Sequence, residues 1–118
     1  TEWVLKTVFT ELYDARVRLE GMILKPNMVI DGKKARKASV EEVAEKTVRC
    51  FRNTVPAAVP GIAFLSGGQT GEEATAHLST MNAGFEMPWK MKPNGQCHYK
   101  DCNNSDLPEI TTFLQTRQ

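Results

Sequence analysis

The chain has 118 residues, of which 41% are hydrophobic and 25% charged, and a formal net charge of +1. This length and composition predict one soluble globular domain. The near-neutral charge argues against nucleic acid and anionic membranes as partners, and no apolar run approaches the ~18 residues of a membrane span. Three cysteines are too few for a disulfide framework, which favours a cytoplasmic setting. The first residues resemble the interior of a helix rather than a signal peptide. Because neither an initiator Met nor a lead-in loop precedes them, the chain is expected to be a piece of a longer one.

Helices and strands are predicted to alternate along the first two thirds of the sequence. Apolar residues at helical spacing predict a helix from Glu2 to about Ala15. Val17–Lys25 is predicted as a strand, which the Pro26-Asn27 turn ends. The charged segment Val29–Ala38 is expected to be a loop.

The most regular helical pattern follows Ser39, which is expected to form a capping box with Glu42. The apolar face behind it consists of Val40, Val43, Ala44, Thr47, Val48 and Phe51. Ile62–Leu65 is then predicted as a short buried strand and Ser66–Gly71 as a glycine-rich turn. Strands that alternate with helices imply parallel pairing and an α/β fold.

A third helix is predicted from Glu72 to about Asn82, with a buried seam formed by Ala74, Leu78 and Met81. His77 is expected on the exposed flank of this helix. Residues 1–83 therefore form the predicted structured segment, and residues 84–118 are expected to be an aperiodic tail, loop or disordered. Within the tail only Ile110–Leu114 is expected to form a short regular element.

Two positions carry candidate chemistry, and Lys25 is the first. An amine at the carboxyl end of a parallel strand lies where α/β folds place their sites, and it can form a Schiff base with a ketone. A strand between helices is usually covered on both faces, so Lys25 is expected to be buried. The alternative is an ordinary strand-end lysine whose charged head reaches solvent.

The second candidate is the turn Ser66-Gly67-Gly68. Two glycines allow backbone N–H groups to approach a phosphate, and the N-terminus of the following helix attracts anions. The alternative is a plain strand-to-helix turn with Thr70 as the helix cap. No metal site is predicted, because the tail offers three candidate ligands, Cys97, His98 and Cys102, without a fourth at a recognised spacing. Both tryptophans, Trp3 and Trp89, are expected to be packing residues.

The segments LEGMILKPNMV and TVPAAVPGIAFLSGGQTGEEA, with the helix between them, resemble class I fructose-bisphosphate aldolase. The resemblance is dense from about Leu19 to Asn82. It implies that the chain is an incomplete part of a (β/α)8 TIM barrel, supplying about two parallel strands and three helices. It also implies that Lys25 is the Schiff-base lysine and that Ser66, Gly67 and Gly68 bind a phosphate of the substrate.

The same resemblance implies the reaction. The lysine condenses with fructose 1,6-bisphosphate, and dihydroxyacetone phosphate and glyceraldehyde 3-phosphate result. No metal or other cofactor is implied, because the iminium itself is the electron sink. The phosphorylated sugar is the expected partner, in glycolysis or gluconeogenesis, and the full-length family member is expected to be a homotetramer.

The chain also departs from this family. The aspartate, glutamate and further lysines that serve as catalytic acids and bases come from strands that would precede Thr1. After Pro88-Trp89-Lys90 the family continues into an eighth strand with a phosphate-binding arginine, and here no such strand or arginine is expected. A frameshift, a read-through or a spurious gene end is the hypothesis for this change, which sequencing past Lys90 in all three frames would test. The alternative function is a non-catalytic aldolase remnant or association module, because a part-barrel has open sheet edges.

Overall fold

The computed structural model describes residues 1–93 of the chain. In chain order these form α1 (Glu2–Asp14), a one-turn 3-10 helix η1 (Leu19–Gly21), β1 (Ile23–Leu24), α2 (Val40–Thr54), β2 (Gly61–Phe64), α3 (Gly71–Gly84) and β3 (Lys90–Pro93). The strands form a parallel sheet in the order β1-β2-β3, so that strands consecutive in the chain are also neighbours in the sheet. The predicted α/β class is confirmed, with three strands in residues 1–93 where about two were expected.

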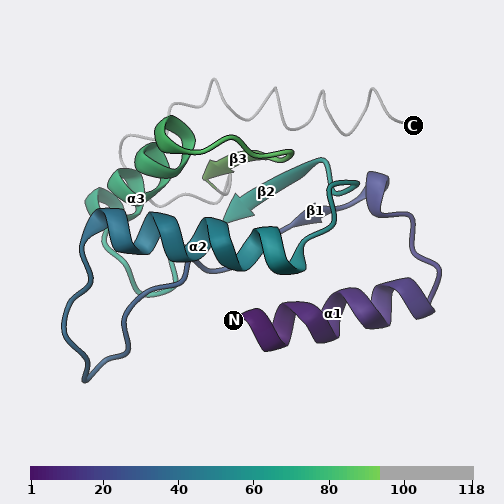
Figure 1. Cartoon of the computed structure of the whole chain (residues 1–118), viewed down its shortest axis with the longest axis horizontal. Helices are drawn as coiled ribbons and strands as arrows, with labels where there is room; N and C mark the ends of the chain where they lie inside the picture. The colour runs from purple at the N-terminus through teal and green to yellow at the C-terminus, as the bar shows by residue number, and fades with distance from the viewer. Residues whose placement is uncertain (94–118) are drawn as a thin grey trace.

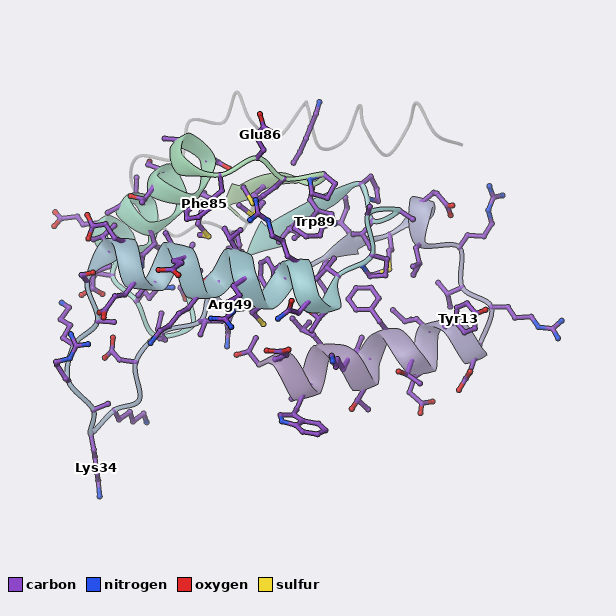
Figure 2. All side chains as sticks on the ribbon, viewed as in Figure 1. Tyr13, Lys34, Arg49, Phe85, Glu86 and Trp89 are labelled. Atoms are coloured by element: carbon purple, nitrogen blue, oxygen red, sulfur yellow. The ribbon has the colours of Figure 1, made fainter. Side chains whose placement is uncertain are left out.

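Helix α2 is central to the packing of the helices. It lies across the sheet and contacts both α1 and α3, which belong to different ends of the described segment (Figure 1). The loop between β1 and α2 extends away from this body, and Lys34 near its tip points away from the other elements (Figure 2). No helix in residues 1–93 combines the length and the apolar character that crossing a bilayer requires.

Both α2 and α3 begin with a capping box. Glu42 donates its backbone N–H to Ser39 Oγ at 3.2 Å, and Ser39 donates its own N–H to the Glu42 carboxylate at 2.9 Å. Thr70 and Glu73 repeat the arrangement at the start of α3. The predicted face of α2 is confirmed: Val43, Ala44, Thr47, Val48 and Phe51 are buried and Val40 is partly buried.

The centre of the core lies between α2 and the sheet. Phe51 has no exposed surface, and its ring stacks on Phe64 with a centroid distance of 5.7 Å. Trp89 meets the same ring edge-on at 6.5 Å and donates its indole N–H to the carbonyl of Pro56 at 3.0 Å. Trp89 is therefore a packing residue, as predicted. The same expectation for Trp3 is wrong, since that side chain is 85% exposed.

The first strand is much shorter than predicted. The expected strand Val17–Lys25 contains η1, and only Ile23–Leu24 pairs with β2. Gly21 donates its N–H to the carbonyl of Arg18 at 3.1 Å, and Met22 donates to Leu19 at 3.2 Å. Because these local turns use backbone N–H groups that a strand would offer to its neighbour, the sheet begins only at Ile23.

The third strand corrects a second expectation, because Lys90–Pro93 lies in the segment predicted to be aperiodic. It pairs with β2 over its whole length, from Gly61 opposite Lys90 to Phe64 opposite Pro93. Gly61 allows close approach on both of its sides: an added Cβ would lie 3.2 Å from the Ile23 side chain and 3.3 Å from the Lys90 carbonyl oxygen. The predicted element at Ile110–Leu114 lies outside the described residues.

Helix α1 agrees with the helix predicted from Glu2 to about Ala15, but only some of its apolar residues are buried. Leu5 and Phe9 are buried, whereas Val4 and Tyr13 are 64% and 80% exposed. Within residues 1–93, α1 is therefore anchored by a narrow strip of apolar side chains facing α2.

Candidate functional site

The two predicted site segments meet at one edge of the sheet. Lys25 directly follows β1, and Ser66 lies two residues beyond the end of the neighbouring strand β2. Past the last paired residues, the backbone N–H of Leu65 donates to the carbonyl of Pro26 at 3.2 Å. The residue after the candidate nucleophile is thus bonded to the residue before the candidate phosphate turn. The structure brings Lys25 and the Ser66-Gly67-Gly68 turn to the carboxyl ends of adjacent parallel strands.

The side chain of Asn27, two residues after Lys25, lies close to Gly67 of the turn. The φ of Gly67 is +58°, in the left-handed region, and an added Cβ would lie 3.1 Å from the side-chain oxygen of Asn27. Gly68 also has a left-handed φ, +88°, but an added Cβ there would meet no atom within 4 Å. Both positions favour glycine because their φ is left-handed. At Gly67 the side chain of Asn27 also leaves little room for a Cβ, whereas Gly68 has open space around it.

Gln69 forms two hydrogen bonds with the first residue of the turn, Ser66. Its backbone N–H donates to the carbonyl of Ser66 at 3.0 Å, and its side-chain Nε2 donates to the same oxygen at 3.1 Å. The other end of the amide, Oε1, lies 2.5 Å from Nδ1 of His77. Sequence reasoning did not identify Gln69, because a glutamine after a glycine-rich turn has no characteristic signature.

His77 corrects a prediction: its side chain is 8% exposed rather than on an open flank. Its position three residues after Ala74 and four before Met81, both buried, was the available signal. Burial lowers the pKa of His77; the charge of Glu73 opposes this shift and that of Lys37 adds to it.

The loop between β1 and α2 is tied to the starts of both following helices. Arg36 forms a salt bridge with Glu42 at 3.0 Å, and Lys37 forms one with Glu73 at 2.7 Å. The hydrogen bond from Lys37, aided by the N–H of Thr70, lowers the pKa of the Glu73 carboxyl. This acidic group at the start of α3 offsets part of the positive potential that the helix terminus adds beside the turn.

Lys25 is exposed, so its expected burial is wrong for the described residues. The physical reason is the shortness of β1 and its position at the edge of the described sheet, because no further strand covers its outer side in residues 1–93. A shallow pocket of about 360 Å³ lies elsewhere, between α1 and the end of α2, where Phe9, Tyr13 and Asn53 contribute to its lining.

No group of three or more potential ligands for a metal ion occurs in residues 1–93. The candidate ligands Cys97, His98 and Cys102 lie outside the described residues. The site thus places Lys25 and a left-handed glycine turn after the ends of neighbouring strands, with the turn leading into the start of α3.

Comparisons with known proteins identify a family and relatives that this chain resembles. The family model described as fructose-bisphosphate aldolase class-I matches residues 1–94. A protein of Xanthomonas axonopodis named "Probable fructose-bisphosphate aldolase class 1" is 54% identical over 92 residues, which are 77% of this chain and 28% of that protein. A cytosolic fructose-bisphosphate aldolase of Arabidopsis thaliana is 51% identical over 92 residues, 77% of this chain and 26% of its own length.

A solved structure extends the similarity to three dimensions. Fructose-bisphosphate aldolase from Plasmodium falciparum, crystallised with TRAP and a small-molecule inhibitor, superimposes with a TM-score of 0.76 and 36% sequence identity. The match covers 98% of this chain and 36% of that one. The chain thus spans about a quarter to a third of the length of these relatives.

Proposed function

Because the chain belongs to the class-I fructose-bisphosphate aldolase family, we propose that it is part of a Schiff-base lyase acting on fructose 1,6-bisphosphate. In this proposal Lys25 is the nucleophile, and Ser66, Gly67 and Gly68 hold a substrate phosphate. The supporting observation is the hydrogen bond from Leu65 to Pro26, which couples the segment after Lys25 to the segment before Ser66.

The proposed chemistry starts at the Nζ atom of Lys25. The neutral amine adds to the ketone carbon of the sugar, and uptake of a proton with loss of water leaves an iminium ion. A base removes the proton of the C4 hydroxyl as the C3–C4 bond breaks. The electron pair of that bond moves into the iminium, and glyceraldehyde 3-phosphate departs as the aldehyde. Protonation of the resulting enamine and addition of water release dihydroxyacetone phosphate and regenerate the amine.

The turn suits the phosphate for geometric reasons. A left-handed backbone at two successive residues, as at Gly67 and Gly68, is available only to glycine at low cost. Ser66 and Gly68 are exposed, so an anion has access to the turn from solvent. The start of α3 follows within a few residues and adds its partial positive charge.

The exposure of Lys25 limits the reactivity expected of its amine in the isolated chain. A Schiff-base lysine needs free amine, which burial or a nearby cation supplies by lowering its pKa. We propose that the remaining strands of a complete barrel enclose Lys25 and provide the proton-transfer groups, which typically contribute about 10²–10⁴-fold each. The chain alone is therefore expected to form an adduct slowly and to turn over poorly.

The test is reductive trapping. The purified chain is incubated with dihydroxyacetone phosphate and borohydride, and the modified residue is located by peptide mass spectrometry. The expected result is a reduced adduct on Lys25 that Lys25→Met abolishes. Lys46→Met is the matched control, since Lys46 is an exposed lysine on α2, and this variant should label as the unsubstituted chain does.

Two outcomes would contradict the proposal. Labelling spread evenly over exposed lysines would show that Lys25 has no special reactivity. An absence of labelling at Lys25, also when the preceding part of an aldolase barrel is added as a separate polypeptide, would favour a non-catalytic remnant or association module.

The names of the relatives support a proposal for the cellular location of the enzyme. The Arabidopsis relative is named as cytosolic, and we propose a cytoplasmic location and a role in glycolysis or gluconeogenesis for this chain. We also propose that the complete protein assembles as a homotetramer. Light scattering on the full-length protein would decide the last point.

A further inference from the structure

His77 is a buried polar residue that the proposed chemistry does not use. In residues 1–93 only Thr47 and His77 are both polar and buried. Thr47 is accounted for, because its hydroxyl accepts the backbone N–H of Val29 at 2.9 Å and so fixes the chain that follows β1. His77 instead directs Nδ1 at the side chain of Gln69, which lies in the segment that follows the glycine turn.

The bond pattern around Gln69 allows one arrangement of protons. Its Nε2 donates to the carbonyl of Ser66, so Oε1 is the amide atom that faces His77. An amide oxygen only accepts, and therefore Nδ1 of the imidazole must carry the hydrogen. Burial lowers the pKa of His77 and favours the neutral ring, which then holds its single proton on Nδ1.

The hydrogen bonds of Gln69 also fix the orientation of the peptide between Ser66 and Gly67. The carbonyl of Ser66 accepts two hydrogen bonds from Gln69, one from the backbone and one from the side chain. The Ser66 carbonyl and the Gly67 N–H belong to the same trans peptide unit and point in opposite directions. Holding the carbonyl toward Gln69 therefore aims the Gly67 N–H away from it.

We propose that Gln69 and His77 are positioning residues for the turn: they lock the Ser66–Gly67 peptide so that the Gly67 N–H faces a phosphate monoester. The identity of the anion rests on the proposed function, whereas the locking of the peptide does not. Neither residue needs to touch the ligand. The side chain of Asn27 also lies close to Gly67.

The test combines two measurements on the ¹⁵N-labelled 118-residue chain. Inorganic phosphate and dihydroxyacetone phosphate are titrated while the amide signals of Gly67 and Gly68 are followed, and hydrogen exchange of the Gly67 N–H is measured without ligand. His77→Leu removes the donor at similar size. His77→Asn retains an N–H near the position of Nδ1, and Thr75→Ala is a control at an exposed position of α3.

The expected result is a loss of phosphate affinity of up to about tenfold in His77→Leu, the effect of one hydrogen bond of ordinary strength. Exchange at Gly67 should accelerate in the same variant. His77→Asn should recover most of both effects, and Thr75→Ala should change neither. Gln69→Ala should reproduce the loss, and it serves in place of His77→Leu if that variant fails to fold.

Long-range ¹H–¹⁵N correlation spectra of the imidazole give a readout that a purely structural role would not move. The positioning role requires the Nδ1–H form in the unsubstituted chain and a shift toward the other tautomer in Gln69→Ala. Finding Nε2–H in the unsubstituted chain would overturn the inference, as would unchanged affinity and exchange in both His77→Leu and Gln69→Ala. If no phosphate binds the unsubstituted chain, the proposed function of the turn fails, and the tautomer and the Gly67 exchange alone decide the positioning role.

Discussion

Replacing Gly67 by alanine tests whether the turn geometry is required. The residue has φ +58°, and for residues with a Cβ the left-handed region costs roughly 1–2 kcal/mol. The new Cβ would also approach the side-chain oxygen of Asn27 to 3.1 Å, so that side chain must move by a few tenths of an ångström. We expect Gly67→Ala to lower the free energy of unfolding by about 1–2 kcal/mol.

Two further variants separate the backbone strain from the side-chain contact. Gly68 has φ +88° with open space around it, so Gly68→Ala should show the backbone term alone. Adding Asn27→Ala to Gly67→Ala should restore the part of the loss that comes from the contact, a few tenths of a kcal/mol.

The assay is urea unfolding followed by circular dichroism, and Gly84→Ala is the reference. Gly84 ends α3 without a left-handed φ and without crowding, so alanine there should be neutral or stabilising by about 0.4–1 kcal/mol. Equal midpoints for Gly67→Ala and Gly84→Ala would refute the reasoning, because they would show that the left-handed turn is not populated in solution.

Three other substitutions give equally direct expectations. Phe51→Ala removes the fully buried ring at the centre of the core and should cost about 3–5 kcal/mol in urea unfolding; a loss below 1 kcal/mol would mean that the core is not packed around it. Ser39→Ala breaks the capping box of α2 and should cost about 1 kcal/mol with reduced helical circular dichroism, whereas Thr75→Ala at an exposed position should not. The lowered pKa of His77 means that the unfolded chain binds a proton first as pH falls below about 6.5, so stability should decline from there until pH passes the folded-state pKa. His77→Asn should flatten this part of the stability profile, and an unchanged slope would contradict the burial of the imidazole.

The predictability of each element from sequence depended on how many independent signals it carried. Helix α2 combines an N-cap, a glutamate three residues on and five apolar residues at helical spacing, and its prediction is confirmed. The strand around Ile23 had only alternation as its signal, and the local turn bonds at Gly21 and Met22 prevailed over it. Strand β3 has four residues, two of them lysine, a pattern too short and too polar to separate from a loop.

The sequence indicated the candidate residues of the site, but not the residues that contact them or the exposure of Lys25. Lys25 and the glycine turn were identified because strand ends in parallel sheets converge at one edge. The hydrogen bonds that link Ser66 to Gln69 and Gln69 to His77 were not predicted, since they depend on side-chain contacts between a loop and the second turn of a helix. The exposure of Lys25 was also missed, because burial depends on neighbouring strands that the local sequence does not specify.

The order of the strands in the sheet has a consequence for how the polypeptide acquires its shape. Because β1, β2 and β3 follow one another in space as they do in the chain, each newly synthesised strand finds its neighbour already present at the growing edge. Within residues 1–93 no strand must wait for a distant one, and the entropy lost in closing loops is spread over modest spans. These three strands can therefore pair one after another as the chain leaves the ribosome.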